Sequence, residues 1–87
     1  MNNVRMDYYT AAWCGPCRSV KPFIHELQAD GWNINIIDSD QNRDLVVTNQ
    51  VSGIPTFIIY KNGVQVRRFT GAKPKSTILD ELTRAAE

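Results

Sequence analysis

Residues 4–20 read Val-Arg-Met-Asp-Tyr-Tyr-Thr-Ala-Ala-Trp-Cys-Gly-Pro-Cys-Arg-Ser-Val. The first seven are rich in aromatic and β-branched residues, which is typical of a strand. Pro16 suits the first turn of a helix, where the N–H that proline lacks would have no partner. The stretch therefore predicts a strand at residues 4–10, a short loop and a helix, with two cysteines at the start of that helix.

The helix has one apolar stripe and a clear end. Four apolar residues follow the i, i+3, i+4, i+7 spacing, which places them on the face that packs against a core. Pro22 lies inside this pattern and is expected to kink the helix. Gly31 is expected to end it. The stripe consists of Val20, Phe23, Ile24 and Leu27.

The rest of the chain alternates between strands and helices. Asn62-Gly63 is the signal of a tight hairpin between two antiparallel strands. A helix between the first two strands implies that those strands are parallel. The predicted order is βαβαββα, an α/β fold with a mixed four-stranded sheet and helices on both faces. The later elements are strand 33–37, a short helix around 45–47, strands 56–60 and 66–70, and helix 74–86.

Size and charge narrow the classes of function. The chain has 87 residues, which fits a single domain spanning 1–87. Ten Lys and Arg against nine Asp and Glu leave a net charge of +1, which argues against nucleic acid or an anionic membrane as a partner. No apolar run reaches the ~18 residues of a membrane span. The N-terminus lacks a signal-peptide pattern, so we expect a cytoplasmic protein.

Cys14 and Cys17 are the two cysteines of the chain. At a helix N-terminus, Cys14 would be favoured as a thiolate by free N–H groups and the helix dipole, and Cys17 would be the resolving thiol. A bridge between them closes a very small loop and stabilises the fold little. A metal site needs two further ligands, and the chain offers one more soft ligand, His25, so no metal is expected.

The chain resembles the thioredoxin family along nearly its whole length. Trp13 to Cys17 is identical to the active-site sequence of that family, and Pro22 matches the proline of its active-site helix. Four further motifs occur in the family's order. They are Asp40-Gln41-Asn42, Gly53-Ile54-Pro55-Thr56, Lys61-Asn62-Gly63 and Gly71-Ala72.

The resemblance implies a thiol–disulfide oxidoreductase that reduces protein disulfides. It implies a cis Ile54–Pro55 peptide facing the cysteines, and a redox-active Cys14–Cys17 disulfide in place of a bound cofactor. A flavoprotein of the thioredoxin-reductase type is the implied electron donor, ribonucleotide reductase is an implied client, and a monomer is expected. The residues implied to contact substrate are Trp13, Gly15, Pro16, Ile54, Pro55, Gly71 and Ala72.

The chain departs from the family in two respects. By the resemblance, longer thioredoxins carry a strand and a helix before the central strand, and residues 1–3 leave no room for them, so we expect an architecture close to that of glutaredoxins. In thioredoxins, an acidic residue six positions before the first cysteine accepts the proton of the resolving thiol. In this chain Tyr8 has that spacing. Asp7 is one residue earlier, which in a regular strand puts it on the other face. Either a bulge brings Asp7 to Cys17 as proton acceptor, or the site beneath Cys17 is apolar or phenolic; we favour the second.

Two other functions stay open at this point. One is a disulfide oxidase or isomerase, although Gly15-Pro16 resembles the dipeptide of the reductases. The other is a thioredoxin-fold subunit of a larger assembly, in which the redox chemistry plays no part. Replacing both cysteines with serine separates these classes, since a structural role would survive the change.

Overall fold

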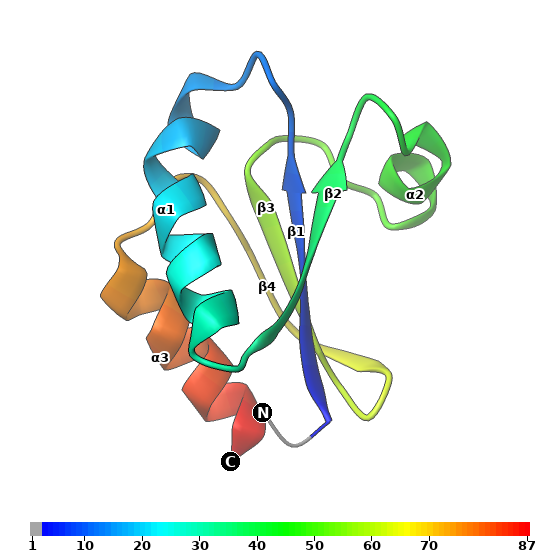
Figure 1. Ribbon diagram of the computed structural model, residues 1–87. Helices are drawn as coiled ribbons and strands as arrows, with labels where there is room; N and C mark the ends of the chain where they lie inside the picture. The colour runs from blue at the N-terminus through cyan, green and yellow to red at the C-terminus, as the bar shows by residue number, and fades with distance from the viewer. Residues whose placement is uncertain (1–2) are drawn as a thin grey trace.

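A four-stranded sheet forms the centre of the molecule, and helices lie on both of its faces (Figure 1). The computed structural model describes residues 3–87. The predicted βαβαββα order is confirmed. The elements are β1 (Val4–Thr10), α1 (Gly15–Ala29), β2 (Asn33–Asp38), α2 (Arg43–Thr48), β3 (Thr56–Lys61), β4 (Val64–Thr70) and α3 (Lys75–Ala86).

The sheet is mixed, in the order β2-β1-β3-β4. Strand β1 pairs in parallel with β2 and antiparallel with β3, and β3 pairs antiparallel with β4. Tyr8 lies opposite Ile36 on one side and Phe57 on the other. The pairings of β1 are regular from end to end, whereas the register of β3 and β4 shifts between Ile59 and Tyr60. Because β1 is an inner strand, its C-terminal end, which leads into the loop before α1, is held by a neighbouring strand on each side.

The main core lies between the sheet and helices α1 and α3. The ring of Phe57 stacks between Tyr8 and Phe69, with ring centroids 5.2 Å and 4.7 Å apart. These two helices cover the same face of the sheet (Figure 1). The buried residues of this core are Val4, Met6, Tyr8, Val20, Ile24, Leu27, Ile34, Phe57, Ile59, Ile78, Leu82 and Ala85.

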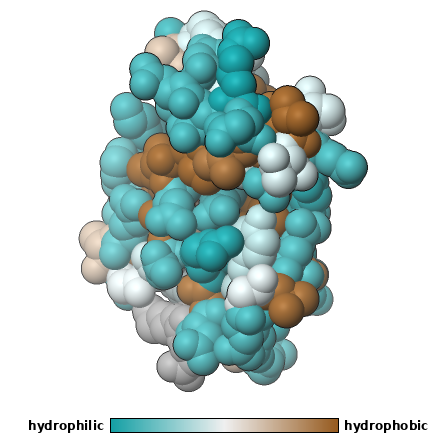
Figure 2. Space-filling view, turned by 90° about the vertical axis from the view of Figure 1, so that its right-hand side faces the viewer, coloured by the Kyte–Doolittle hydropathy of each residue, from teal (hydrophilic) through white to brown (hydrophobic). Residues whose placement is uncertain are grey.

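The opposite face of the sheet is covered by the short helix α2 at one end. Tyr9, Val51 and Ile58 form a small buried cluster there, and Val46 of α2 packs against it. The surface on this side is mainly hydrophilic, with a band of hydrophobic residues across its upper part (Figure 2). Within residues 3–87, no helix is long and apolar enough to cross a membrane.

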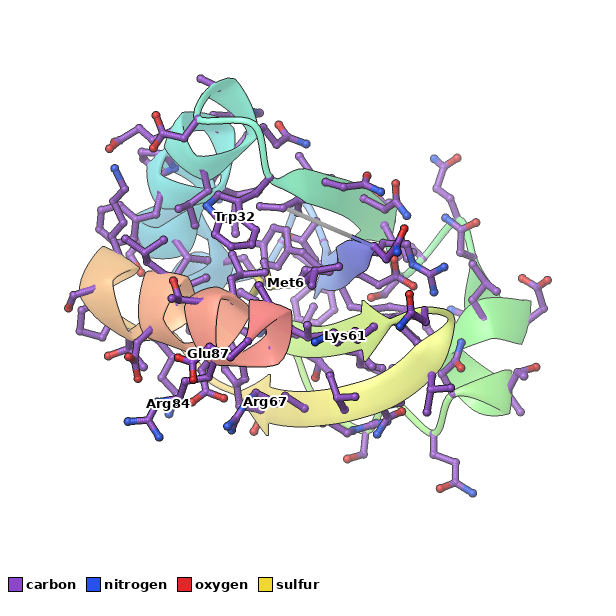
Figure 3. All side chains as sticks on the ribbon, turned by 90° about the horizontal axis from the view of Figure 1, so that it is seen from below. Met6, Trp32, Lys61, Arg67, Arg84 and Glu87 are labelled. Carbon is purple, nitrogen blue, oxygen red and sulfur yellow. A yellow bond between two sulfur atoms is a disulfide. The ribbon has the colours of Figure 1, made fainter. Side chains whose placement is uncertain are left out.

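The end of the molecule away from the cysteines is held together by contacts to α3. Lys61 of β3 donates a hydrogen bond from Nζ to the backbone carbonyl of Glu87 at 2.6 Å. Arg67 of β4 forms an ion pair with Glu81 at 3.3 Å. Figure 3 shows Lys61 and Arg67 beside the last helix, with Arg84 on its outer side. Strand and helix ends are thereby joined far from the β1–α1 junction.

The structure adjusts the sequence-based boundaries in small ways. Helix α1 continues through Pro22 as far as Ala29. The apolar spacing of the last helix predicts that Ile78, Leu79, Leu82 and Ala85 share one buried stripe. Ile78, Leu82 and Ala85 are buried, but Leu79 is 38% exposed, so its inclusion was wrong. Leu79 lies about 100° around the helix from Ile78, at the edge of the buried face, and is therefore partly exposed.

Removing side-chain volume beneath α1 tests the main core. We expect Ile24→Ala to lower the free energy of unfolding by about 3 kcal/mol, because the side chain is fully buried and its loss leaves a cavity. Val47→Ala is the matched control: Val47 is 76% exposed, and its truncation should change the free energy by less than about 0.5 kcal/mol. Urea unfolding followed by circular dichroism measures both. Equal losses in the two variants would contradict this assignment of the core.

Candidate active site

The two cysteines lie where the chain passes from β1 to helix α1. Cys14 is the N-cap residue of that helix, as predicted, and its backbone N–H donates to the carbonyl of Ala11 at 3.1 Å. The Sγ atom of Cys14 accepts the backbone N–H of Cys17 at 3.2 Å. A disulfide joins the two residues, whose Cα atoms are 5.3 Å apart. The position of Cys17 one turn into the helix predicts that it is less exposed than Cys14, but each cysteine is 3% exposed, so this prediction was wrong.

The loop before β3 closes over the cysteines from one side. The Ile54–Pro55 peptide is cis, as the resemblance implied. Ile54 packs against the small buried cluster formed by Ala11, Cys14 and Cys17. The hydroxyl of Thr56 donates to the carbonyl of Gly53, which closes the turn. The sequence therefore predicted correctly that this loop meets the cysteines.

Gly71 is brought to the same loop from the end of β4. Its N–H donates to the carbonyl of Pro55 at 2.9 Å. Its φ of +89° lies in the region that glycine adopts without strain. Ala72 follows it and is exposed. Of the residues implied to contact substrate, Ile54, Pro55 and Gly71 are thus joined by direct contacts around the disulfide.

Trp13 is 66% exposed but is held in place by a residue that sequence reasoning did not assign to the site. Its indole Nε1–H donates to Oδ2 of Asp40 at 2.8 Å. Asp40 is itself held by a turn, because its backbone N–H donates to Oδ1 of Asp38 at 2.9 Å. The sequence indicates a turn at Asp40, but nothing local to it points to Trp13, which is 27 residues away along the chain.

Tyr8, and not Asp7, lies on the cysteine side of β1. The phenol of Tyr8 donates to the backbone carbonyl of Cys17 at 3.2 Å. Burial raises the pKa of Tyr8 above its usual value of 10, so the phenol is neutral at ordinary pH and is no base there. The favoured phenolic environment beneath Cys17 is therefore what the structure shows.

Asp7 points to the opposite face of the sheet, which carries α2. Its Oδ1 lies 3.2 Å from Nε of Arg5 and accepts a hydrogen bond from Nδ2 of Asn35 at 3.0 Å. The pairing of β1 runs without a bulge through this position. The structure does not bring Asp7 to the cysteines.

The described residues hold no metal cluster. Among residues 3–87, no group of three or more His, Cys, Asp and Glu side chains comes together to hold an ion. His25 is exposed on α1. What the site offers chemically is a dithiol–disulfide pair at a helix N-terminus, which can exchange with an external thiol or disulfide.

Comparison with known proteins gives consistent matches. The family model described as Thioredoxin matches residues 2–84. The thioredoxin of Mycolicibacterium smegmatis is 39% identical over 87 residues, covering 94% of this chain and 77% of that protein. The chloroplastic thioredoxin Y of rice is 36% identical, covering 97% of this chain, which spans 51% of the rice protein. A bifunctional thioredoxin reductase/thioredoxin of Mycobacterium leprae is 36% identical, covering 92% of this chain and 18% of that protein.

The fold also matches solved structures. A single-residue mutant of the thioredoxin from Halobacterium salinarum superimposes with a TM-score of 0.92 at 29% sequence identity. The match covers 99% of this chain and 77% of that one. The four-stranded sheet and three helices described above are therefore the thioredoxin-like fold.

Breaking the Trp13–Asp40 hydrogen bond should free the indole. In a Trp32→Phe background, where Trp13 is the one remaining tryptophan, we expect Asp40→Ala to lower the fluorescence anisotropy of Trp13. The free energy of unfolding should fall by no more than about 1 kcal/mol, because the bond is exposed to water. Asp40→Asn, which keeps a side-chain oxygen acceptor, is the control. An unchanged anisotropy in Asp40→Ala would show that the hydrogen bond does not fix the ring.

The separation of Asp7 from the cysteines can be tested by kinetics. We expect Asp7→Ala to leave the rate at which Cys17 resolves a mixed disulfide within about threefold of wild type, because its carboxylate faces away from the thiols. The rate is measured by stopped-flow fluorescence. A loss of about 100-fold would identify Asp7 as the proton acceptor after all.

Tyr8→Phe, which removes the hydrogen bond to Cys17, should lower the free energy of unfolding by about 1 kcal/mol.

Proposed function

Because the chain belongs to the thioredoxin family, we propose that it works in the reducing direction, with Cys14 as the attacking and Cys17 as the resolving thiol. The broader activity, thiol–disulfide oxidoreduction, follows from the family and from the Cys14–Cys17 disulfide. The observation that carries the proposal is the N-cap position of Cys14. There the sulfur accepts the N–H of Cys17, and partial positive charge at the helix N-terminus favours a thiolate.

The reaction consists of two exchanges. The Cys14 thiolate attacks one sulfur of a client disulfide, forms a mixed disulfide and releases the other client sulfur as a thiolate, which takes up a proton. Cys17 then loses its proton and attacks Sγ of Cys14. The second client sulfur leaves as a thiolate and is protonated in turn. The client gains two electrons and two protons, and the protein ends with the Cys14–Cys17 disulfide.

The surface around the disulfide is suited to an extended client segment. Backbone groups beside a reactive sulfur allow a segment to pair as an added strand, and we assign this role to the Ile54–Pro55 loop. The exposed indole of Trp13 supplies apolar contact beside it. The contact surface that we propose consists of Trp13, Gly15, Pro16, Ile54, Pro55, Gly71 and Ala72.

The oxidised protein needs an external electron donor. Thioredoxins work with thioredoxin reductase, and the M. leprae relative carries both names. We take the donor of this chain to be a flavoprotein of that type. The clients would be enzymes that form a disulfide during turnover, such as ribonucleotide reductase. We further propose that residues 1–87 act as one monomeric domain in electron transport in the cytoplasm, where such a pair is kept reduced.

Trapping the mixed disulfide tests the proposed roles. In Cys17→Ser the second exchange cannot occur, so the covalent adduct between Cys14 and a disulfide-bonded protein such as insulin should accumulate. Cys14→Ser should form at least about tenfold less adduct, because the N-cap position that favours a thiolate belongs to Cys14 in this scheme, whereas Cys17 lies within the helix. Non-reducing electrophoresis and mass spectrometry measure both.

The variant with both cysteines replaced is the control, and it should form no adduct. Equal adduct in the two single variants would overturn the assignment of attacking and resolving thiols. Failure of the wild-type protein to reduce insulin with dithiothreitol as donor would overturn the reducing function and leave a structural subunit as the alternative.

A further inference from the structure

The disulfide is approached from a second side by a cleft of about 400 Å³. Both Cys14 and Cys17 line it, but none of Trp13, Ile54 and Gly71 does. The cleft is therefore separate from the surface proposed above for client proteins. Its volume is within the range of small-molecule sites, about 300–1,000 Å³.

The wall of the cleft formed by α1 is cationic. Arg18, Lys21 and His25 line it from the first three turns of the helix. Within residues 3–87, neither Arg18 nor Lys21 forms an ion pair, so both charges are available to a ligand. Cations without a partner beside a concave surface attract anions and raise their local concentration.

The opposite wall carries one acidic group, whose acceptor capacity is partly used. Asp38 lines the cleft, and its Oδ1 accepts the backbone N–H groups of Asp40 and Gln41 at 2.9 Å and 3.3 Å. The floor is formed in part by Tyr8 and by Ile36, which is 43% exposed. The cleft thus combines an apolar floor, a net positive charge and two reactive sulfurs.

We propose that this cleft binds small disulfides and thiols that carry carboxylates, and that the protein exchanges with them as a second class of substrate besides proteins. The inference rests on the redox activity of Cys14 and Cys17. The Cys14 thiolate attacks one sulfur of the small disulfide RSSR, forming Cys14–S–S–R and releasing RS⁻. Cys17, once deprotonated, attacks Sγ of Cys14 and releases the second RS⁻. Two protons convert both products to RSH, and the protein dithiol becomes the disulfide.

The test uses three disulfides of similar length and different charge. They are 3,3′-dithiodipropionate, which is dianionic, bis(2-hydroxyethyl) disulfide, which is neutral, and cystamine, which is dicationic. The rate at which each oxidises the reduced protein is followed by tryptophan fluorescence and divided by its rate with dithiothreitol, which removes differences in intrinsic reactivity. The quantity compared between proteins is the ratio of the dianion rate to the neutral rate. Any change in the nucleophilicity of Cys14 cancels in this ratio, because the same thiolate attacks both compounds.

For the wild-type protein at low salt, we expect the ratio of the dianion rate to the neutral rate to be about tenfold higher than the ratio of the cystamine rate to the neutral rate. The ratio for the dianion should decrease as salt is added. In the double variant Arg18→Gln/Lys21→Gln, the dianion ratio should fall about five- to tenfold. The matched control is Lys61→Gln/Arg84→Gln, which removes the same number of positive charges near the ends of β3 and α3, at the other end of the molecule from the β1–α1 junction (Figure 1). It should keep the ratio within about twofold of wild type.

Three results would overturn the proposal. An unchanged ratio in the Arg18/Lys21 variant would show that the cleft does not select anions. An equal fall in the control would assign the effect to the overall charge of the protein. Charge selection for an acidic disulfide-bonded peptide but not for dithiodipropionate would assign the cations to client proteins.

The redox function and the cleft can fail separately. Reduction of insulin together with an unselective reaction with small disulfides would leave the redox function standing without the cleft site. A binding measurement adds a readout without chemistry, using thiodipropionate, the thioether analogue that cannot exchange. It should shift the amide resonances of Tyr8, Arg18 and Ile36, and the absence of any shift at millimolar concentration would count against the site.

Discussion

The structure depends on the capping of helix α1 by Cys14. The sulfur of this residue accepts the N–H of Cys17, so the reactive group itself satisfies one of the free donors at the helix start. The position of this cap is fixed on the sheet side by β1, an inner strand that is paired with a neighbour on each side. On the side of the loop before β3, Ile54 packs against the cysteines, and Gly71 is hydrogen-bonded to Pro55. A rigid sheet, a helix end and two loops thus fix one pair of sulfurs.

A phenol fills the space beneath the resolving cysteine. Tyr8 lies on the core side of β1 and reaches the carbonyl of Cys17, while the carboxylate of Asp7 is held by Arg5 and Asn35 on the other face. A neutral phenol can be buried at little cost, whereas a lone carboxylate there would need a charged partner. The carboxylate of Asp7 is thus kept away from Cys17, whose residue lines the cleft together with Cys14.

The sequence allowed most of the fold to be predicted, because its signals are local. Near neighbours in the chain determine the apolar stripe of α1, formed by Val20, Ile24 and Leu27, and the turn at Asn62. They also determine the alternation along β1 that puts Asp7 and Tyr8 on opposite faces of the sheet. The residues of the Ile54–Pro55 loop were found through family motifs. Contacts between distant segments could not be predicted. The bond from Trp13 to Asp40 and the cleft formed by α1 and β2 exist only once the sheet has assembled.

The reduction potential of the Cys14–Cys17 couple is the most direct test of a reducing function. The protein is equilibrated with defined dithiothreitol and glutathione buffers, and its free thiols are trapped by alkylation and counted by mass spectrometry. A reductase of protein disulfides requires a value near that of thioredoxins, about −270 mV. A value in the range of about −120 to −180 mV would instead place the pair with disulfide oxidases and isomerases and contradict the reducing function.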